Sequence, residues 1–150
     1  MIQYDNALQI ISDLDIAVDI AMQRRDMVDW PKVVLGIAIR ENVYEKYDPL
    51  YYERRYGEGG LGDYENMEAT YDAGTHTLEI EDVAIGNPRF EPTDGRIDEI
   101  VENGGPWNYA LRPDPGPRPF YSKAEELMES RIGEYDAALE EIINNILNGT

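Results

Sequence analysis

The C-terminal part of the chain carries the strongest structural pattern in the sequence. From Phe120 onward, apolar residues recur at spacings of three and four, as they do along one face of an α-helix, and the run closes at Asn148-Gly149. A long helix of this kind must bury its apolar stripe against other elements, which constrains the fold more than any other feature. The stripe consists of Ala124, Leu127, Met128, Ile132, Tyr135, Leu139, Ile142, Ile143, Ile146 and Leu147.

Three further helices are expected from spacing and from cap residues. Apolar residues recur from Tyr4 to about Met22, which predicts an amphipathic helix with Leu8, Ile11, Ile16 and Ile20 among its apolar positions. A second helix is predicted from Trp30 to about Tyr47, with Asp29 as its cap, Pro31 in its first turn and Gly36 as a point of close helix contact. A short third helix, capped by Asp94, ends at Asn103-Gly104-Gly105.

A β-hairpin is predicted between these helices. Residues 70–80 alternate as two strands around a tight turn at Asp72-Ala73-Gly74, and Val83 and Ile85 extend the second strand. Five prolines between Pro106 and Pro119 exclude a regular helix or central strand there and indicate an arm or loop. The sequence therefore predicts one α+β domain over residues 1–150, with a small antiparallel sheet, N-terminal helices, a long C-terminal helix and a proline-rich arm at about 106–119.

The charge of the chain limits the partners it can bind. Its 150 residues include 31 acidic and 13 basic residues, a net charge of −18. Binding to phosphate backbones requires clustered positive charge, so specific nucleic-acid binding is not expected. The acidic surface either keeps the protein soluble or lines a passage through which a polyanion slides without adhering.

The residue inventory gives little support to catalysis or to a cofactor. There is no cysteine, and three aspartates interrupt the apolar N-terminus, so we expect no disulfide, no thiolate nucleophile, no signal peptide and no membrane span. His76 is the single histidine, and its predicted place in a hairpin strand favours a half-exposed structural residue over a catalytic base. Ser12, Ser122 and Ser130 lack a nucleophile-elbow motif.

Phosphate and metal sites are also not indicated. No glycine-rich loop leads into a Lys-Ser or Lys-Thr pair, which a nucleotide phosphate cradle requires. Acidic groups such as Asp94, Asp98 and Glu99 lack the pattern of a calcium loop. We therefore expect no catalytic, cofactor or metal residues, and a protein that is not an enzyme.

A segment rich in tyrosine, from Asn42 to Met67, points to specific contacts. Tyrosine joins an apolar face to a hydroxyl group, and arginine offers a planar set of donors, so both residue types suit contact surfaces. The tyrosines either pack the second helix against the sheet or contact another subunit. Arg54 and Arg55 are expected to bind carboxylates, within the fold or on a neighbouring subunit.

The order of short motifs in this chain resembles that of the tail-component or tail-completion proteins of long-tailed bacteriophages. The resemblance covers roughly Trp30 to Leu147. The motifs that carry it are Asn42-Val43-Tyr44, Tyr47, Pro49, Tyr52, Arg54-Arg55, Gly60-Leu61, Ile100-Val101-Glu102-Asn103-Gly104, Trp107 and Arg118-Pro119-Phe120.

The resemblance implies a structural protein of the virion neck. Such a protein is assembled in the host cytoplasm and forms a ring of identical subunits at the head–tail junction, next to connector and tail proteins, with DNA as passing cargo and no membrane. Tail completion, tail termination and connector stopping remain open as its role. The residues expected at subunit contacts are Tyr51, Tyr52, Arg54, Arg55, Leu61, Trp107, Arg118 and Phe120.

Two other classes of function remain as alternatives. The acidic charge alone supports a DNA mimic that inhibits a nucleic-acid-binding protein, although a mimic places its carboxylates in rows like phosphates, whereas these are scattered between apolar positions. A hydrolase with two distant carboxylates requires a deep pocket and a carboxylate with a raised pKa.

Overall fold

The computed structural model describes residues 7–46, 59–86, 96–105 and 116–149. Within these ranges the chain forms four α-helices and one antiparallel pair of strands, which confirms the expected α+β fold. A π-helical turn, Arg40–Tyr44, continues the second helix, and a 3₁₀ turn, Tyr64–Asn66, precedes the first strand. In chain order the helices and strands are α1 (Ala7–Met22), α2 (Arg25–Ile39), β1 (Met67–Asp72), β2 (Thr77–Asp82), α3 (Ile97–Asn103) and α4 (Phe120–Leu147).

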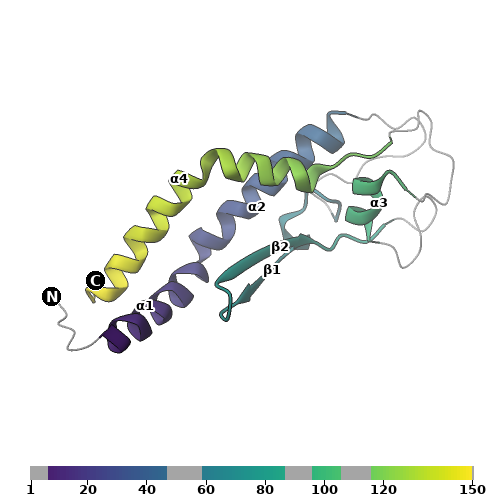
Figure 1. The fold of residues 1–150 in the computed structure, drawn as a ribbon. Helices are drawn as coiled ribbons and strands as arrows, with labels where there is room; N and C mark the ends of the chain where they lie inside the picture. Colours follow the sequence, from purple (N-terminus) through teal and green to yellow (C-terminus); the bar gives the residue numbers. More distant parts are fainter. Residues whose placement is uncertain (1–6, 47–58, 87–95, 106–115, 150) are drawn as a thin grey trace.

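The long helix α4 organises the arrangement of the other elements. α1 and α2 follow one another along its length, so that the start of α1 and the end of α4 lie at the same end (Figure 1). The hairpin of β1 and β2 lies on the side of α2 away from α4, and α3 lies near the start of α4. The 28 residues of α4 give it a length of about 42 Å, so it reaches well beyond the hairpin.

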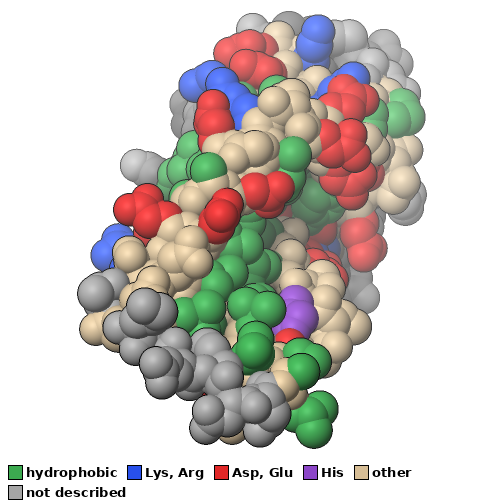
Figure 2. All heavy atoms as spheres, turned by 60° about the vertical axis from the view of Figure 1, so that its left-hand side comes forward, with side chains coloured by type: hydrophobic (Ala, Val, Ile, Leu, Met, Phe, Trp, Pro, Cys, Tyr) green, Lys and Arg blue, Asp and Glu red, His purple; other side chains and the backbone are tan. Residues whose placement is uncertain are grey.

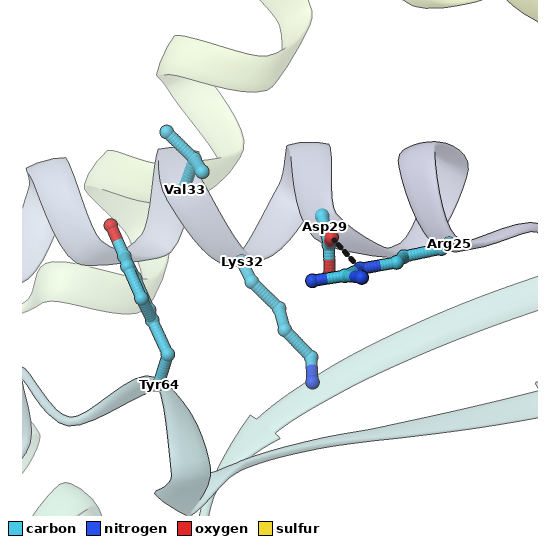
Figure 3. A pocket seen from close by; sticks show the side chains of 5 residues that line it. All are labelled: Arg25, Asp29, Lys32, Val33 and Tyr64. Carbon is cyan, nitrogen blue, oxygen red and sulfur yellow. Dashed lines mark hydrogen bonds and ion pairs between the residues drawn. The ribbon is translucent and has the colours of Figure 1, made fainter.

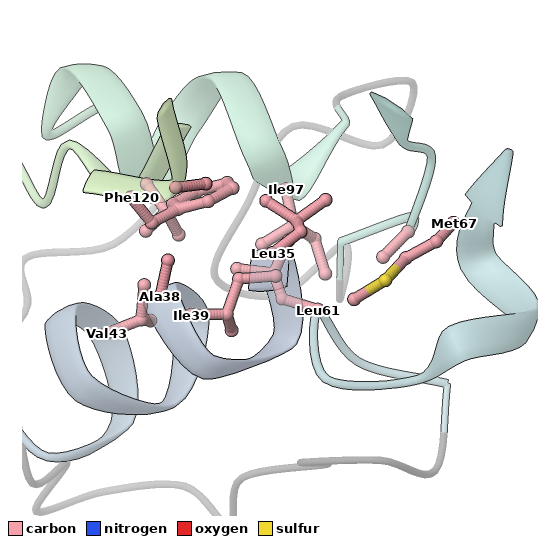
Figure 4. Packing of buried hydrophobic residues seen from close by; sticks show 11 residues of the cluster. Leu35, Ala38, Ile39, Val43, Leu61, Met67, Ile97 and Phe120 are labelled. Atoms are coloured by element: carbon pink, nitrogen blue, oxygen red, sulfur yellow. The ribbon is translucent and has the colours of Figure 1, made fainter. Parts of the chain in front are cut away.

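The main hydrophobic core lies where α2, α3 and the start of α4 meet the base of the hairpin. Phe120 is fully buried on the side of the cluster near Ala38 and Val43, and Leu61 and Met67 lie on its other side, beyond Ile97 (Figure 4). Burial of these side chains holds the two halves of the chain together. The cluster consists of Leu35, Ala38, Ile39, Val43, Leu61, Met67, Ala84, Ile97, Val101, Phe120 and Ala124.

A much smaller apolar cluster joins α4 to the end of α1 and the start of α2. Its buried members are Ala21, Met27 and Ile142, with partly buried residues such as Tyr135 and Leu139 around them. This part of the molecule is therefore held by few buried side chains, and the outer half of α1 projects beyond it.

The start of α2 differs from the prediction. The helix begins at Arg25, and Pro31 lies inside it with its ring buried, whereas Asp29 was expected as the cap and Pro31 in the first turn. A proline inside a helix leaves the carbonyl four residues earlier without its usual N–H donor. The hydroxyl of Tyr135 in α4 donates to that carbonyl, on Met27, at 3.3 Å, so a tertiary contact compensates for the proline.

Replacing Tyr135 with phenylalanine is therefore expected to destabilise the domain by about 1–2 kcal/mol, because the Met27 carbonyl loses its donor while the ring is kept. The free energy of unfolding in urea measures the effect. Tyr64→Phe is the matched control, since Tyr64 is exposed and has no hydrogen bond to a described residue. Equal stability of the two variants would contradict this role of Tyr135.

The hairpin forms as predicted, with a different turn. β1 and β2 pair in register from Met67 opposite Asp82 to Asp72 opposite Thr77, so four residues, Ala73 to His76, connect them. His76 has a φ of 51° and lies in this turn, not in a strand as predicted. β2 ends at Asp82, and Ile85 forms an isolated bridge with Arg96 instead of extending the strand.

The end of α3 fixes the path of the chain into α4. Gly104 ends the helix, as expected, with a φ of 78°, and a Cβ atom here would lie 2.5 Å from the backbone nitrogen of Pro117. Because only glycine allows this close approach, the N–H of Arg118 reaches the carbonyl of Val101 at 3.0 Å. The expected cap Asp94 lies outside the described residues, and Arg96 precedes the helix.

Candidate functional site: the exposed apolar face of the first helix

Helix α1 exposes most of its large apolar side chains, because few of its residues are covered by the rest of the described structure. Of its 16 residues, Ala17, Ala21 and Met22 are buried. Six large apolar side chains of α1 are between 43% and 79% exposed, and Leu8 is the most exposed of them. Exposed apolar surface of this extent typically marks an interaction site. The six residues are Leu8, Ile10, Ile11, Leu14, Ile16 and Ile20.

These six side chains, called the α1 face below, are distributed around much of the helix instead of along a single stripe, because successive residues are rotated by about 100°. Leu8, Ile11, Ile16 and Ile20 were predicted as apolar positions of an amphipathic helix, but all four side chains are exposed. The sequence holds one indication of the difference. Ile10 and Leu14 extend the apolar residues beyond a single stripe, and an ordinary amphipathic surface helix is apolar on one face only.

Acidic residues accompany the α1 face. α1 contains Asp13, Asp15 and Asp19 and no basic residue. Figure 2 shows hydrophobic side chains gathered in a strip next to His76, with acidic side chains over the upper part of the same view. A partner for this face therefore needs apolar groups flanked by positive charge.

A polar cluster fastens the hairpin to α1 beside this face. The Tyr71 hydroxyl donates to Asp19 Oδ1 at 2.7 Å, and His76 Nδ1 lies 3.0 Å from the same oxygen. The other ring nitrogen of His76 lies 3.2 Å from Asp15 Oδ1. Burial, followed by the hydrogen bond to Asp19, raises the pKa of Tyr71 to about 12, so the hydroxyl remains a donor at neutral pH.

The geometry of this cluster explains His76 as a tether between hairpin and helix. Both ring nitrogens face carboxylates of α1, and Asp15 and Asp19 are one helical turn apart on one face. The sequence prediction of a half-exposed structural residue missed these partners. The spacing of four between the two aspartates was the available indication.

A second polar network lies at the base of the hairpin. The Arg96 guanidinium binds both carboxylate oxygens of Asp98, at 3.1 and 2.6 Å, and also donates to the carbonyl of Asp82 at 2.7 Å. The Tyr121 hydroxyl donates to Asp98 at 2.8 Å and accepts from the N–H of Asp82 at 3.0 Å. The network therefore links β2, α3 and α4, and neither Arg96 nor Tyr121 was predicted from the sequence as a site residue.

Asp82 belongs to this network and is fully buried. Its Oδ1 accepts the N–H of Ala84 at 3.0 Å, while its Oδ2 has no hydrogen-bond partner among the described residues. Burial raises the pKa of Asp82 to about 7, and the charge of Asp98 adds to the rise, whereas the Ala84 N–H and Arg96 oppose it. A hydrolase with two carboxylates needs such a group to face substrate, and Asp82 has no exposed surface.

The residues expected at subunit contacts fall into two groups. Tyr51, Tyr52, Arg54, Arg55 and Trp107 lie outside the described residues. The other three are buried within the chain: Leu61 and Phe120 in the main core and Arg118, 6% exposed, at the start of α4.

Burial changes the role of those three residues. A side chain that packs inside its own subunit has almost no surface to offer another. The burial of Leu61, Arg118 and Phe120 in their glycine-leucine and Arg-Pro-Phe motifs is therefore explained by the fold of one chain.

The described residues form neither a metal site nor a membrane span. In this part of the chain, no three acidic or histidine side chains are grouped as metal ligands. Asp98, considered above as a cation ligand, binds Arg96 instead. None of the described helices combines the length and apolar character needed to cross a membrane.

Comparisons with known proteins assign the chain to a family. No curated protein and no solved structure matches it. The family described as YomN matches residues 31–145, a range that runs from α2 to near the end of α4 and includes the main core, the hairpin and the Arg96 network. Because this match covers most of the chain, the protein belongs to the YomN family.

Proposed function

We propose that the protein is a structural component of the neck of a long-tailed bacteriophage. In this role it completes the tail, or joins it to the head connector, as a ring of subunits around the DNA channel. The α1 face is the observation that carries the proposal: six large apolar side chains are exposed on one helix. Such a surface is stabilised by association, and repeated contacts between identical subunits close into a ring when the rotation permits.

The net negative charge of the chain is consistent with a location around a channel through which DNA passes. A net charge of −18 repels a phosphate backbone, so DNA passes an acidic channel without adhering. The order of tyrosine, arginine and glycine motifs supports the phage assignment through its resemblance to tail-completion proteins. Connector and tail proteins are the neighbours that this role implies.

Association through the α1 face is tested with the double variant Leu8→Gln/Ile11→Gln. Both side chains are largely exposed, so the free energy of unfolding is expected to stay within about 0.5 kcal/mol of wild type. Loss of two apolar contacts is expected to weaken self-association about a hundredfold. Sedimentation velocity measures the association, and electron microscopy of the wild type shows whether the oligomers are rings.

A matched control distinguishes a specific effect of the α1 face from a general effect of removing any exposed apolar side chain. Ile132 of α4 is 47% exposed and lies outside α1, so Ile132→Gln is expected to keep the wild-type oligomer. A wild-type protein that stays monomeric at high concentration would overturn the proposed ring. Normal rings formed by the double variant would overturn the role of the α1 face.

A further inference from the structure

A pocket on α2 lies outside the networks that hold the fold together. Its volume is about 310 Å³, and Arg25, Asp29, Lys32, Val33 and Tyr64 line it. Lys32 extends from α2 toward the hairpin, with Tyr64 on one side and the Arg25–Asp29 ion pair on the other (Figure 3). The lining thus carries one positive charge, that of Lys32, in addition to the Arg25–Asp29 ion pair.

The charge of Lys32 has no counterpart within the described part of the chain. Arg25 forms an ion pair with Asp29 at 3.3 Å, but Lys32 forms none with any described residue and is half-buried. Lys46 and Arg131 also lack a described partner, yet both are exposed. A half-buried ammonium interacts with a carboxylate more strongly than an exposed one does, because solvent screens it less.

The other walls of the pocket are apolar and well defined. Val33 and Tyr64 are 44% and 52% exposed. A Cβ atom on Gly36 would lie 2.8 Å from the Tyr64 ring, so glycine allows this ring to lie against α2. Gly36, expected at a helix contact, thus makes its close contact with the 3₁₀ turn. The pocket suits a carboxylate that has apolar neighbours.

We infer that this pocket receives an aspartate side chain and its apolar neighbours from the acidic, apolar helix α1 of a second copy of this chain. α1 offers aspartates between exposed apolar residues, as in Asp13-Leu14-Asp15-Ile16, and has no basic residue. Asp15 is 63% exposed although His76 lies 3.2 Å from one of its oxygens, and the pocket supplies the Lys32 ammonium beside Val33 and Tyr64, so charge and polarity are complementary. The α1 face and the pocket are different surfaces, so the contact is heterologous and repeats from subunit to subunit.

This inference rests on the proposed function, since it names the contact through which the subunits associate. The change Lys32→Glu is expected to raise the dissociation constant of self-association by at least about tenfold, because it places like charges in contact. Lys46→Glu changes the net charge equally outside the pocket and is expected to have less than about a twofold effect. Sedimentation velocity of the full chain measures both.

A second measurement identifies the contact directly. Isotope-labelled and unlabelled chains are mixed and treated with a carbodiimide, which joins a lysine amine to a carboxylate in direct contact. Mass spectrometry is expected to find peptides that link Lys32 of one copy to Asp13 or Asp15 of another.

The outcomes distinguish this inference from the ring itself. Wild-type rings that Lys32→Glu and Lys46→Glu affect equally, with no intermolecular link at Lys32, would overturn the pocket contact and leave the ring in place. A monomeric wild-type protein would overturn both.

Discussion

Replacing Arg96 with methionine is expected to lower the free energy of unfolding by about 3–5 kcal/mol, the cost of leaving a buried carboxylate without its cation. Asp98 is 2% exposed, and the Tyr121 hydroxyl would be its remaining described side-chain partner. The same change also removes the donor to the Asp82 carbonyl. Urea unfolding followed by circular dichroism measures the loss, which is large for a domain of this size.

Two further variants make this prediction specific. Arg25→Met breaks an ion pair in which Arg25 is 94% exposed, so its expected cost is below about 1 kcal/mol. Adding Asp98→Asn to Arg96→Met removes the stranded charge and is expected to restore part of the loss. The proposed role of the network fails if Arg96→Met costs no more than Arg25→Met.

The stability of the protein is expected to fall as the pH rises from about 4 to about 7, because Asp82 binds a proton in the folded state throughout this window. Its pKa is about 7 when folded, against an ordinary value of 3.8. The unfolded chain releases this proton at lower pH than the folded one, so raising the pH favours unfolding until both states are deprotonated. A shift of this size corresponds to up to about 4 kcal/mol.

The variant Asp82→Asn separates this effect from general charge repulsion, which also grows with pH in an acidic protein. Asparagine cannot release the proton, so the stability of the variant relative to wild type is expected to increase between pH 4 and pH 7. Asp136→Asn removes an exposed carboxylate of α4 and is expected to keep the wild-type pH dependence. Parallel curves for Asp82→Asn and wild type would contradict the raised pKa.

The sequence predicted those elements whose determining residues are close together along the chain, and misplaced those that depend on distant residues. α4 begins at Phe120 and ends at Leu147 as predicted, because a long apolar period and a closing Asn-Gly pair are contained in the helix itself. Gly104 ended α3 for the same kind of reason. The start of α2 was misplaced because the donor that offsets Pro31 comes from Tyr135, which is 104 positions later in the sequence.

The exposure and the neighbours of the candidate site residues depended even more on contacts between residues that are far apart in sequence. Periodicity located the apolar residues of α1 but did not show that six of its large apolar side chains are exposed. Leu61 and Phe120 were expected at a contact surface because their motifs are distinctive, yet packing places them inside the fold. The sequence did not predict Lys32 as a site residue, since the pocket around it is formed together with Tyr64 and Arg25.

The sequence alone determined the class of fold, the helical character of both ends, the hairpin, the acidic charge and the absence of cysteine chemistry. These features follow from composition, short-range periodicity and cap residues, which act over a few positions along the chain. The tertiary structure decided which apolar faces are covered, which carboxylates are buried, and where a lysine remains without a described partner. Burial and charge pairing depend on residues that are far apart in sequence, so only the packed structure sets the exposure of the α1 face and the pocket on α2.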